Sequence, residues 1–377
     1  MRTYIIFEAK AFFFQKKILG LFVLWLLVGL GILGQINFLD YGNHEVGLYN
    51  ELNDTRVVLR SVETYYRDSE TEMTLADNLY KQQNLLAMKY NGVKFEESDW
   101  FYNAGMELAE LRLDADDYSD EKVPASLFPS RDLSERQFVE YEALKEAQLP
   151  NRIESKNVYD YGKKILSIYG TLAFLFTLLL SSDVGLRDLS HPTLVKNYPI
   201  QANTRQLIQT GIIVLGGTVG LLILTGVNFG LARIVWSTSD WVWPIGYYQS
   251  MQYLAIPLVQ YILYFAFYLF ILMIHTTLYS FLVNQVFKNQ YVTIMTGGLL
   301  YAFGFLLTSN QGWMRWLPFP YYHVDNVLTG FLAEQVHPEI HLVDGVLVLL
   351  IWGMLFMGLS FMLTSPRRRK ENGYVAD

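Results

Sequence analysis

Two histidines in the segment 337–341 (HPEIH) are the best candidates for metal ligands in the sequence. A zinc-binding helix needs the pattern His-Glu-x-x-His, which places both imidazoles on one helical face. Here Pro338 follows the first histidine, and proline is compatible only with the first turn of a helix. No third ligand follows at a fixed spacing, although His323 precedes the segment. We therefore expect no metal centre and no resident cofactor in this chain.

A second group of candidates is polar but lies within long apolar stretches. Polar and ionisable side chains inside a membrane are functional candidates, because they line pathways or hydrogen-bond one helix to another. The expected pathway residues are Gln35, Asn228, Gln260 and His275. His275 is expected near a helix end, where it could equally be an ordinary interfacial residue. No Ser-His-Asp arrangement can be placed at one membrane depth, so we expect no enzymatic activity.

Charge-free apolar stretches must position these residues. Of the 377 residues, 52% are apolar and 17% are charged. A spanning helix needs about 20 apolar residues, and a charge at its centre costs about 3 kcal/mol on the insertion scale. The aromatic stretch 241–253 resembles an interfacial belt rather than a seventh span. The sequence thus predicts an all-α membrane protein with six transmembrane helices, at 18–38, 165–182, 207–229, 254–276, 291–308 and 344–364.

The distribution of basic residues predicts the orientation of these helices. Loops rich in Lys and Arg stay in the cytoplasm. The two ends of the chain and two alternate loops hold 12 basic residues, against 4 on the other side outside the stretch 37–162: Arg233 and Arg315 in short loops, and Lys163 and Lys164, which do not fit the pattern, at the mouth of the second span. Both termini should therefore be cytoplasmic, with residues 367–377 as a tail. The first apolar stretch is expected to be a retained span and not a cleaved signal peptide, because no small-x-small cleavage site follows it.

Residues 39–162 are expected to form an extracellular domain between the first and second spans, and residues 163–366 a transmembrane domain with the other five. The stretch 37–162 contains 26 acidic and 13 basic residues. This acidity is typical of an exposed, soluble domain, although it could attract a cationic ligand. The overall net charge of −7 and the lack of a basic surface exclude a nucleic-acid-binding protein.

Helix signals dominate the extracellular domain. Asp132 and Glu135 form a capping-box pattern that precedes apolar residues at helical spacing. Further helices are expected at about 70–90 and 99–113, and a loop at 114–130. We therefore expect this domain to be mostly helical.

Residues 1–17 are expected to form a helix in the headgroup plane. Apolar rings and basic groups fall on different faces of such a helix. Three consecutive Phe residues at 12–14 would be poor solvent-facing residues. The alternative is a cytoplasmic extension of the first span. Within the spans, glycines such as Gly216, Gly217 and Gly220 should let helices pack closely.

The loop between the second and third expected spans, residues 183–206, begins with an acid and ends near a Pro-Ile pair. These residues are Asp183 and Pro199-Ile200. Together with an in-plane first helix and a large outer domain, they resemble the permease subunits of type-2 ABC exporters. In that family the second span ends in a loop of the form Glu-x3-Gly-Thr followed by Pro-Ile-Ser.

The match to this pattern covers the architecture of the membrane frame more than the residue identities. Arg187-Asp188 occupies the region of the Gly-Thr pair, and Gln201 replaces the serine. The segment 317–330 (LPFPYYHVDNVLTG) is similar to the Pro-Phe-x-Tyr segment ahead of the last span in the family. The extracellular domain carries no part of the resemblance.

The resemblance implies the permease subunit of an ATP-binding-cassette exporter in a bacterial plasma membrane. It would form a pathway for a hydrophobic or amphipathic peptide, lipid or drug, together with a second permease copy. ATP and Mg²⁺ would bind a separate cytoplasmic ATPase, since this sequence has no Gly-x4-Gly-Lys-Ser/Thr loop. The residues expected to couple the permease to the ATPase are Asp183, Arg187, Asp188, Pro199 and Ile200.

An alternative function is that of a membrane receptor or an immunity protein. Its extracellular domain would bind a ligand, and its spans would only anchor it or relay the signal. A gene for a small ATPase beside this one would favour the exporter.

Overall fold

The computed structural model describes residues 1–39, 43–65, 70–117, 129–147, 156–186, 188, 200–236, 241–305 and 312–364. The chain forms two compact units. The first unit comprises Met1–Leu30, Ile165–Gly230 and Ile262–Asp377, and the second unit comprises Gly31–Lys164 and Leu231–Tyr261.

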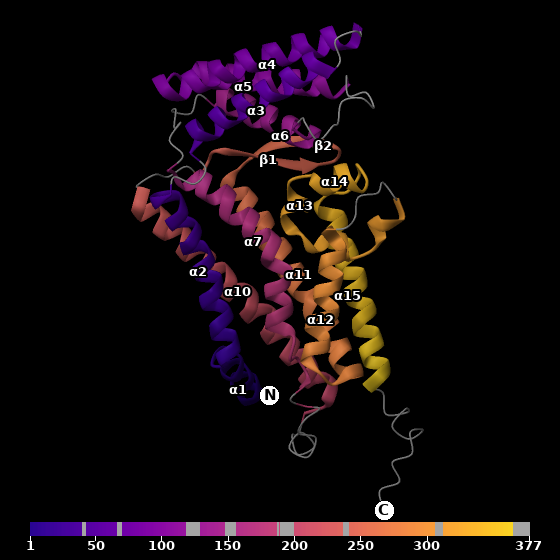
Figure 1. Ribbon diagram of the computed structural model, residues 1–377. Coiled ribbons are helices and arrows are strands. Elements are labelled where there is room, and N and C mark those ends of the chain that lie inside the picture. The colour runs from indigo at the N-terminus through magenta and orange to yellow at the C-terminus, as the bar shows by residue number, and fades with distance from the viewer. Residues whose placement is uncertain are drawn as a thin grey trace, which may run out of the picture. The chain divides into compact units, whose positions relative to one another are not determined.

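Five helices among the described residues are long and apolar enough to cross a membrane (Figure 1). They are α2 (Lys16–Phe38), α7 (Val158–Ser181), α10 (Ala202–Trp236), α11 (Leu258–Phe287) and α15 (Leu342–Thr364). Each overlaps a stretch that the sequence predicts to span the bilayer, so the chain is a mostly helical membrane protein, as predicted. The fifth predicted span, 291–308, overlaps α12 (Gln290–Phe305), which is 16 residues long and is not among these five helices. The count of six spans and the extracellular location of residues 39–162 stay predictions.

The amino-terminal helix is separate from the first apolar helix. α1 (Arg2–Phe13) ends three residues before α2 begins at Lys16. α1 and α2 therefore do not form one continuous helix. The position of α1 relative to a bilayer stays a prediction.

In the first unit, glycines of α10 receive large side chains from neighbouring helices. A Cβ atom at Gly220 would lie 2.4 Å from Cζ of Phe22 in α2. A Cβ atom at Gly217 would lie 2.6 Å from Cε of Met273 in α11. The two glycines thus allow the close helix packing that the sequence predicts. The ring of Phe22 and the thioether of Met273 occupy the space that a side chain at these positions would fill.

Between α12 and α15 the described chain forms short helical turns that complete an aromatic core. The ring of Phe174 in α7 stacks on Tyr322 at a centroid distance of 3.8 Å, and Tyr301 of α12 lies on Phe174 at 5.7 Å. Aromatic pairs of this kind contribute beyond the area that they bury. The turns are η2 (Gly312–Trp316), η3 (Phe319–Tyr322), α13 (Val324–Leu328) and α14 (Phe331–Gln335).

Among the described residues, four helices lie wholly in the second unit, and leucine-rich clusters join the first three of them. The helices are α3 (His44–Tyr65), α4 (Glu70–Phe95), α5 (Ser98–Asp117) and α6 (Arg131–Glu146). One cluster contains Leu48, Leu52, Leu86 and Leu108, and a second contains Leu59, Val62, Leu75, Leu79 and Ala115.

Three of these helices were expected from the sequence, and α3 was not singled out. The capping box expected at Asp132 and Glu135 is not formed. The N-cap of α6 is Ser130, Asp132 lies in the first turn, and Glu135 instead accepts a hydrogen bond from Arg131 at 2.9 Å. Of the loop expected at 114–130, residues up to 117 belong to α5, and residues 118–128 lie outside the described residues.

The second unit also contains an antiparallel hairpin, β1 (Pro244–Gln249) and β2 (Gln252–Pro257). Its two turn residues, Ser250 and Met251, both have positive φ angles, at 52° and 64°, as a type I′ turn requires. The stretch 241–253 therefore belongs largely to a hairpin and not to a seventh helix, and its place at a membrane interface stays a prediction. The predicted fourth span at 254–276 is shifted, because its first residues belong to β2.

A buried carboxylate joins this hairpin to the helices of the second unit. Glu140 of α6 accepts a hydrogen bond from the backbone N–H of Gly246 at 2.8 Å and from Nζ of Lys163 at 2.7 Å. Glycine is needed here, since a Cβ atom at position 246 would lie 2.1 Å from Cγ of Arg136. The pairing also accounts for Lys163, a base that the charge distribution alone did not explain.

Candidate functional site

The acid at the end of α7 binds the junction between α1 and α2. Oδ1 of Asp183 accepts a hydrogen bond from Nζ of Lys17 at 2.7 Å, and its Oδ2 accepts one from Nε2 of Gln15 at 2.7 Å. Lys17 also donates to Oγ of Ser182 at 3.1 Å. One carboxylate thus connects the end of α7 to both residues that flank the start of α2.

A second carboxylate connects the following segment to α10. Asp188 accepts hydrogen bonds from Nε of Arg205 at 3.3 Å and from Nε2 of Gln209 at 3.2 Å. Nη1 of Arg205 donates to the carbonyl oxygen of Ile200 at 2.7 Å. Two of the predicted coupling residues, Asp188 and Ile200, are therefore brought together by Arg205.

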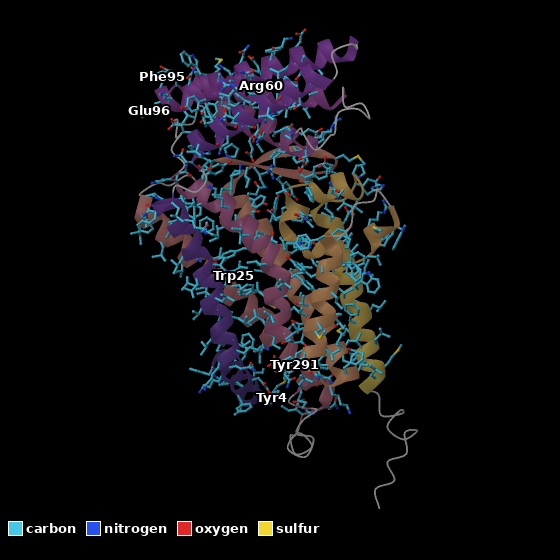
Figure 2. The ribbon with its side chains drawn as sticks, in the orientation of Figure 1. Tyr4, Trp25, Arg60, Phe95, Glu96 and Tyr291 are labelled. Atoms are coloured by element: carbon cyan, nitrogen blue, oxygen red, sulfur yellow. The ribbon has the colours of Figure 1, made fainter. Side chains whose placement is uncertain are left out.

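The network continues from α10 to α1. Nε2 of Gln209 also donates to the hydroxyl of Tyr4 at 3.3 Å. Burial, together with the hydrogen bond to Glu8, raises the pKa of Tyr4 well above its ordinary value, so the phenol stays neutral. Polar contacts therefore link the residues at the start of α2 to the end of α7 through Asp183, and α1 to α10 through Gln209. Figure 2 shows Tyr4 on α1.

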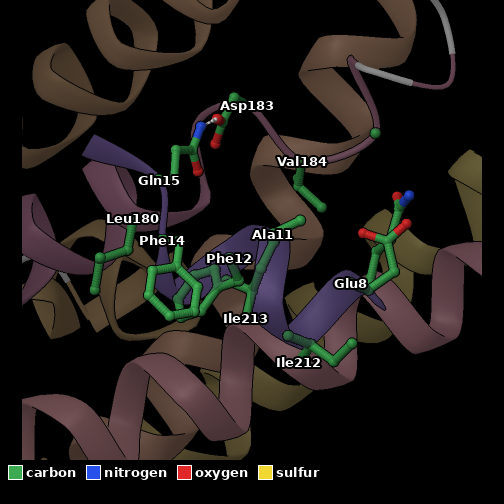
Figure 3. Close-up of a pocket in the computed structure, with 12 residues that line it drawn as sticks. Glu8, Ala11, Phe12, Phe14, Gln15, Leu180, Asp183, Val184, Ile212 and Ile213 are labelled. Carbon is green, nitrogen blue, oxygen red and sulfur yellow. Dashed lines mark hydrogen bonds between the residues drawn. The ribbon is translucent and has the colours of Figure 1, made fainter. Parts of the chain in front are cut away.

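A cavity of about 440 Å³ adjoins both sets of contacts. Its polar lining residues are Glu8, Gln15, Asp183 and Gln209, and its apolar walls include Phe12 and Ile213. Figure 3 shows Glu8 and Asp183 on opposite sides of Ala11 and Phe12, with the hydrogen bond from Gln15 to Asp183 drawn. The predicted site residue Asp183 thus lies at an apolar hollow with a polar edge.

The sequence indicated only part of this arrangement. Arg187 and Pro199, the other two predicted coupling residues, lie outside the described residues. Lys17 had been counted only as a charge that sets orientation, and Gln15 had not been singled out. A polar residue directly after three Phe residues was the one available signal for Gln15.

The predicted pathway residues do not form one site. Asn228 is fully buried and donates from Nδ2 to the hydroxyl of Tyr169 at 2.7 Å, which in turn donates to the carbonyl oxygen of Trp25 at 2.7 Å. Trp25, labelled in Figure 2, stacks on Tyr169 at a centroid distance of 3.9 Å. Asn228 therefore belongs to a set of contacts between helices. Gln35 is exposed on α2, in the second unit.

His275 lies well inside α11, and the expectation that it sits near a helix end is wrong because this helix continues to Phe287. The imidazole is buried, with Nδ1 2.9 Å from the carbonyl oxygen of Leu349 and Nε2 3.1 Å from the hydroxyl of Tyr322. It thus connects α11 with α15 and η3. Gln260 is partly buried near the start of α11 and belongs to the second unit.

The two histidines of the segment 337–341 contact residues close to them in the chain, and Nδ1 of His337 accepts a hydrogen bond from the backbone N–H of Glu339 at 3.3 Å. Nδ1 of His341 contacts the carbonyl oxygen of Glu339 at 2.9 Å and also the carboxylate of Asp344. The carboxylate of Glu339 pairs with Arg315 at 2.8 Å. In the described part of the chain, no group of three or more His, Cys, Asp or Glu side chains could hold a metal ion.

Comparisons of this chain with models of protein families, with curated proteins and with solved structures find no match. The functional argument therefore depends on the contacts around Asp183 and on the pattern of the sequence.

Proposed function

We propose that this chain is the membrane permease subunit of an ATP-driven exporter, coupled through the segment 183–206 to a separate ATPase chain. The main support is the contact of Asp183 with Lys17 and Gln15, because it joins the end of α7 to the junction of α1 and α2. The resemblance of this segment to type-2 exporters supports the same assignment. In this proposal both termini and the segment 183–206 face the cytoplasm, and the domain at 39–162 faces outward.

The contacts around the segment suggest how movement would be transmitted. Two ATPase chains that close on ATP would displace the segment at the cytoplasmic surface. Asp183 would carry this displacement to α1 and α2, and Asp188 would carry it through Gln209 to α10. ATP shifts such a protein between states only if its binding free energy differs between them. The pathway between two permease copies would then open outward and release a hydrophobic or amphipathic cargo.

Charge reversal tests the coupling. Lys17→Asp and Asp183→Lys each place like charges together, whereas the double variant restores an opposite pair. Full-length chain would be purified through a tag from a bacterium that encodes it, and ATP hydrolysis by the recovered complex would be measured. We expect each single reversal to lower hydrolysis several-fold and the double variant to recover most of it.

Arg315→Asp provides the control, because it breaks an exposed ion pair with Glu339 away from the segment. Its ATP hydrolysis should match that of the unmodified chain. Hydrolysis that is unchanged in both single variants would refute the coupling role of Asp183. If no ATPase accompanies the chain at all, the receptor function is favoured instead.

The absence of native cysteine allows a direct test of orientation. Asp99→Cys and Gln201→Cys each place one thiol at an exposed position, in α5 and in the segment 183–206. A membrane-impermeant maleimide should label Asp99→Cys in intact cells and Gln201→Cys only after permeabilisation. The reverse pattern would overturn the proposed orientation.

A further inference from the structure

The two strands of the hairpin, labelled in Figure 1, differ in how their outer edges are bonded. In an antiparallel pair, hydrogen-bonded pairs of residues alternate with pairs whose N–H and C=O groups point away from the neighbouring strand. The backbone N–H of Leu258 donates to the carbonyl oxygen of Trp243, so these two residues form a hydrogen-bonded pair and fix the alternation. The outward-pointing pairs are therefore Tyr248–Tyr253, Gly246–Ala255 and Pro244–Pro257.

The outer edge of β1 is capped by side chains of the same unit. The outward N–H of Gly246 donates to the carboxylate of Glu140 at 2.8 Å. The outward carbonyl oxygen of Pro244 accepts a hydrogen bond from the hydroxyl of Tyr159. Both of these β1 residues are buried. Side chains of α6 and α7 therefore occupy the positions that a further strand beside β1 would need.

The outer edge of β2 has no such caps in the part of the chain that the structure describes. The outward backbone groups of Tyr253 and Ala255 have no hydrogen-bond partner among these residues. Leu254 between them is 42% exposed, and Ala255 is partly exposed. The turn Ser250–Met251 ends the edge on one side, and Pro257, which has no N–H, ends it on the other. β2 thus offers a short edge of two donors and two acceptors.

This edge also lacks the charges that usually keep other strands away. Proteins protect an exposed edge with charged side chains, above all lysine, or by covering it. Residues 241–257 contain no charged side chain, whereas the stretch 37–162 contains 26 acidic and 13 basic residues. The edge of β2 is therefore suited to receive another strand.

The edge is complementary to a second copy of itself. Two β2 strands that run antiparallel about Leu254 place Tyr253 of each copy opposite Ala255 of the other. Each facing pair exchanges two hydrogen bonds, so every outward donor and acceptor of these two residues is used. A register centred on Tyr253 would instead place Ala255 opposite Met251 of the turn. A register centred on Ala255 would place Tyr253 opposite Pro257, which cannot donate.

We propose that the β2 strands of two copies of this chain pair antiparallel about Leu254 and form one four-stranded sheet. Hydrogen bonds join Tyr253 of each copy to Ala255 of the other, and the two Leu254 side chains face each other. Two copies with the same orientation in one membrane have their hairpins on the same side. The pairing rests on the proposed function only for the presence of a second copy, and it adds a surface that joins the copies.

The lack of native cysteine allows this pairing to be tested by disulfide formation. Leu254→Cys would place two thiols directly opposite each other at a Cα separation of about 4.5 Å, within the disulfide range of about 4.4–6.8 Å. Gln252→Cys is the matched control on the same strand, because the proposed register separates its two copies by about 13 Å. Asp99→Cys, at an exposed position in α5, measures random collision.

Full-length chain in its native membrane is oxidised with copper phenanthroline, and disulfide-linked dimer is measured by non-reducing electrophoresis. We expect about tenfold more dimer for Leu254→Cys than for either control, because only its thiols meet the geometry of a disulfide. Mass spectrometry of the product identifies the linked chain. Two copies of this chain are expected, and a disulfide to a different protein would overturn the proposal.

A second pair of variants tests the hydrogen bonds themselves. Ala255→Pro in the Leu254→Cys chain removes an outward N–H and leaves the hydrogen bonds between β2 and β1 in place. It should lower the amount of dimer several-fold. Ala255→Ser keeps the N–H and should leave the amount of dimer unchanged. Thermal unfolding of the reduced chains shows whether each variant is folded, and the comparison of Leu254→Cys with its two controls does not depend on the proline variant.

The outcomes are distinct from those of the coupling test. Equal amounts of dimer for Leu254→Cys and Asp99→Cys would overturn the pairing, and so would dimer that Ala255→Pro leaves unchanged in a folded chain. Neither result would alter the ATP hydrolysis expected of the exporter. Conversely, a Leu254→Cys dimer in a chain that no ATPase accompanies would support the pairing and refute the proposed function.

Discussion

Different kinds of interaction stabilise the interior of each of the two units. In the first unit, large side chains fill the space above glycines, and uncharged groups such as Tyr169 and Asn228 hydrogen-bond across helices. In the second unit, leucine-rich clusters form the core, and charged groups are buried with partners. The contrast agrees with the proposed topology, in which the first unit lies in lipid and the second in water, because burial of apolar surface drives folding in water but provides little association between helices in lipid.

Buried cations show this difference between the two units at single residues. In the second unit, the side chain of Arg112 is 2% exposed and pairs with Glu51. Lys89 is 4% exposed and lies over the rings of Tyr141 and Phe101, at 4.7 Å and 5.3 Å from their centroids. Cation–π contacts of this kind offset part of the cost of removing an ammonium from water. The first unit also buries a charged pair, Arg205 with Asp188, but at the start of α10; farther along its apolar helices the described polar contacts include hydroxyl, amide and imidazole groups.

The largest effect should come from placing one charge on each outer surface. Ile223 of α10 and Val57 of α3 are both β-branched and are 60% and 62% exposed. Ile223→Asp should cost about 3 kcal/mol of insertion free energy, because Ile223 faces lipid in the proposed topology. Val57→Asp should change stability by less than about 0.5 kcal/mol, because Val57 faces water in the same topology. Yield of the full chain in the membrane fraction and thermal unfolding in detergent measure the two effects.

Equal losses in these two variants would break the comparison between the units. If Ile223→Asp were tolerated, α10 would face a partner or a water-filled space at that position. If Val57→Asp were as harmful as Ile223→Asp, the exposed face of α3 would be covered in the native protein. Either result would mean that one of the two exposed surfaces does not face the solvent that the comparison assigns to it.

The two units also differ in how far the sequence predicts them. Apolar stretches of about 20 residues without charge identify five helices, because insertion of a charge is costly and the signal is local. The helices at 70–95 and 98–117 follow from local helical spacing in the same way. The hairpin at 244–257 was missed, because its Tyr, Gln and Pro residues are equally typical of an interfacial belt.

Contacts between distant segments were the part that could not be predicted. Asp183 was singled out by a motif, yet its partner Lys17 lies 166 positions earlier. Glu140 was read only as part of an acidic domain, although it joins α6 to Gly246 and Lys163. Periodicity reports which face of a helix is buried, and it does not report which polar group that face meets.

A smaller effect is expected from adding one methyl group to each of two glycines of α10. Gly220 lies against the ring of Phe22, whereas a Cβ atom at Gly226 would meet nothing within 4 Å. Gly220→Ala should destabilise the first unit by about 1–3 kcal/mol, as overpacking does. Gly226→Ala should be neutral or slightly stabilising, because alanine favours the helix. Thermal unfolding of both variants in the same detergent measures the difference.

The outcome sharpens the comparison because both changes are identical in chemistry. A loss at Gly226 as large as at Gly220 would mean that the outward face of α10 is packed against another molecule. No loss at Gly220 would mean that Phe22 moves aside freely. Packing through glycine would then not be what holds α2 against α10.

The smallest effect should come from one hydroxyl between helices. Tyr169→Phe removes the oxygen that donates to the carbonyl of Trp25 and accepts from Asn228. Hydrogen bonds between membrane helices average about 0.6 kcal/mol and reach about 1.7 kcal/mol, so the expected loss of unfolding free energy lies in that range.

Tyr291→Phe is the matched control, since this tyrosine is 66% exposed on α12. Unfolding in mixed detergent micelles measures both, and the control should show no change. A loss well above 2 kcal/mol at Tyr169 would mean that buried polar groups stabilise the first unit as strongly as ion pairs stabilise the second, which would contradict the distinction between the two units.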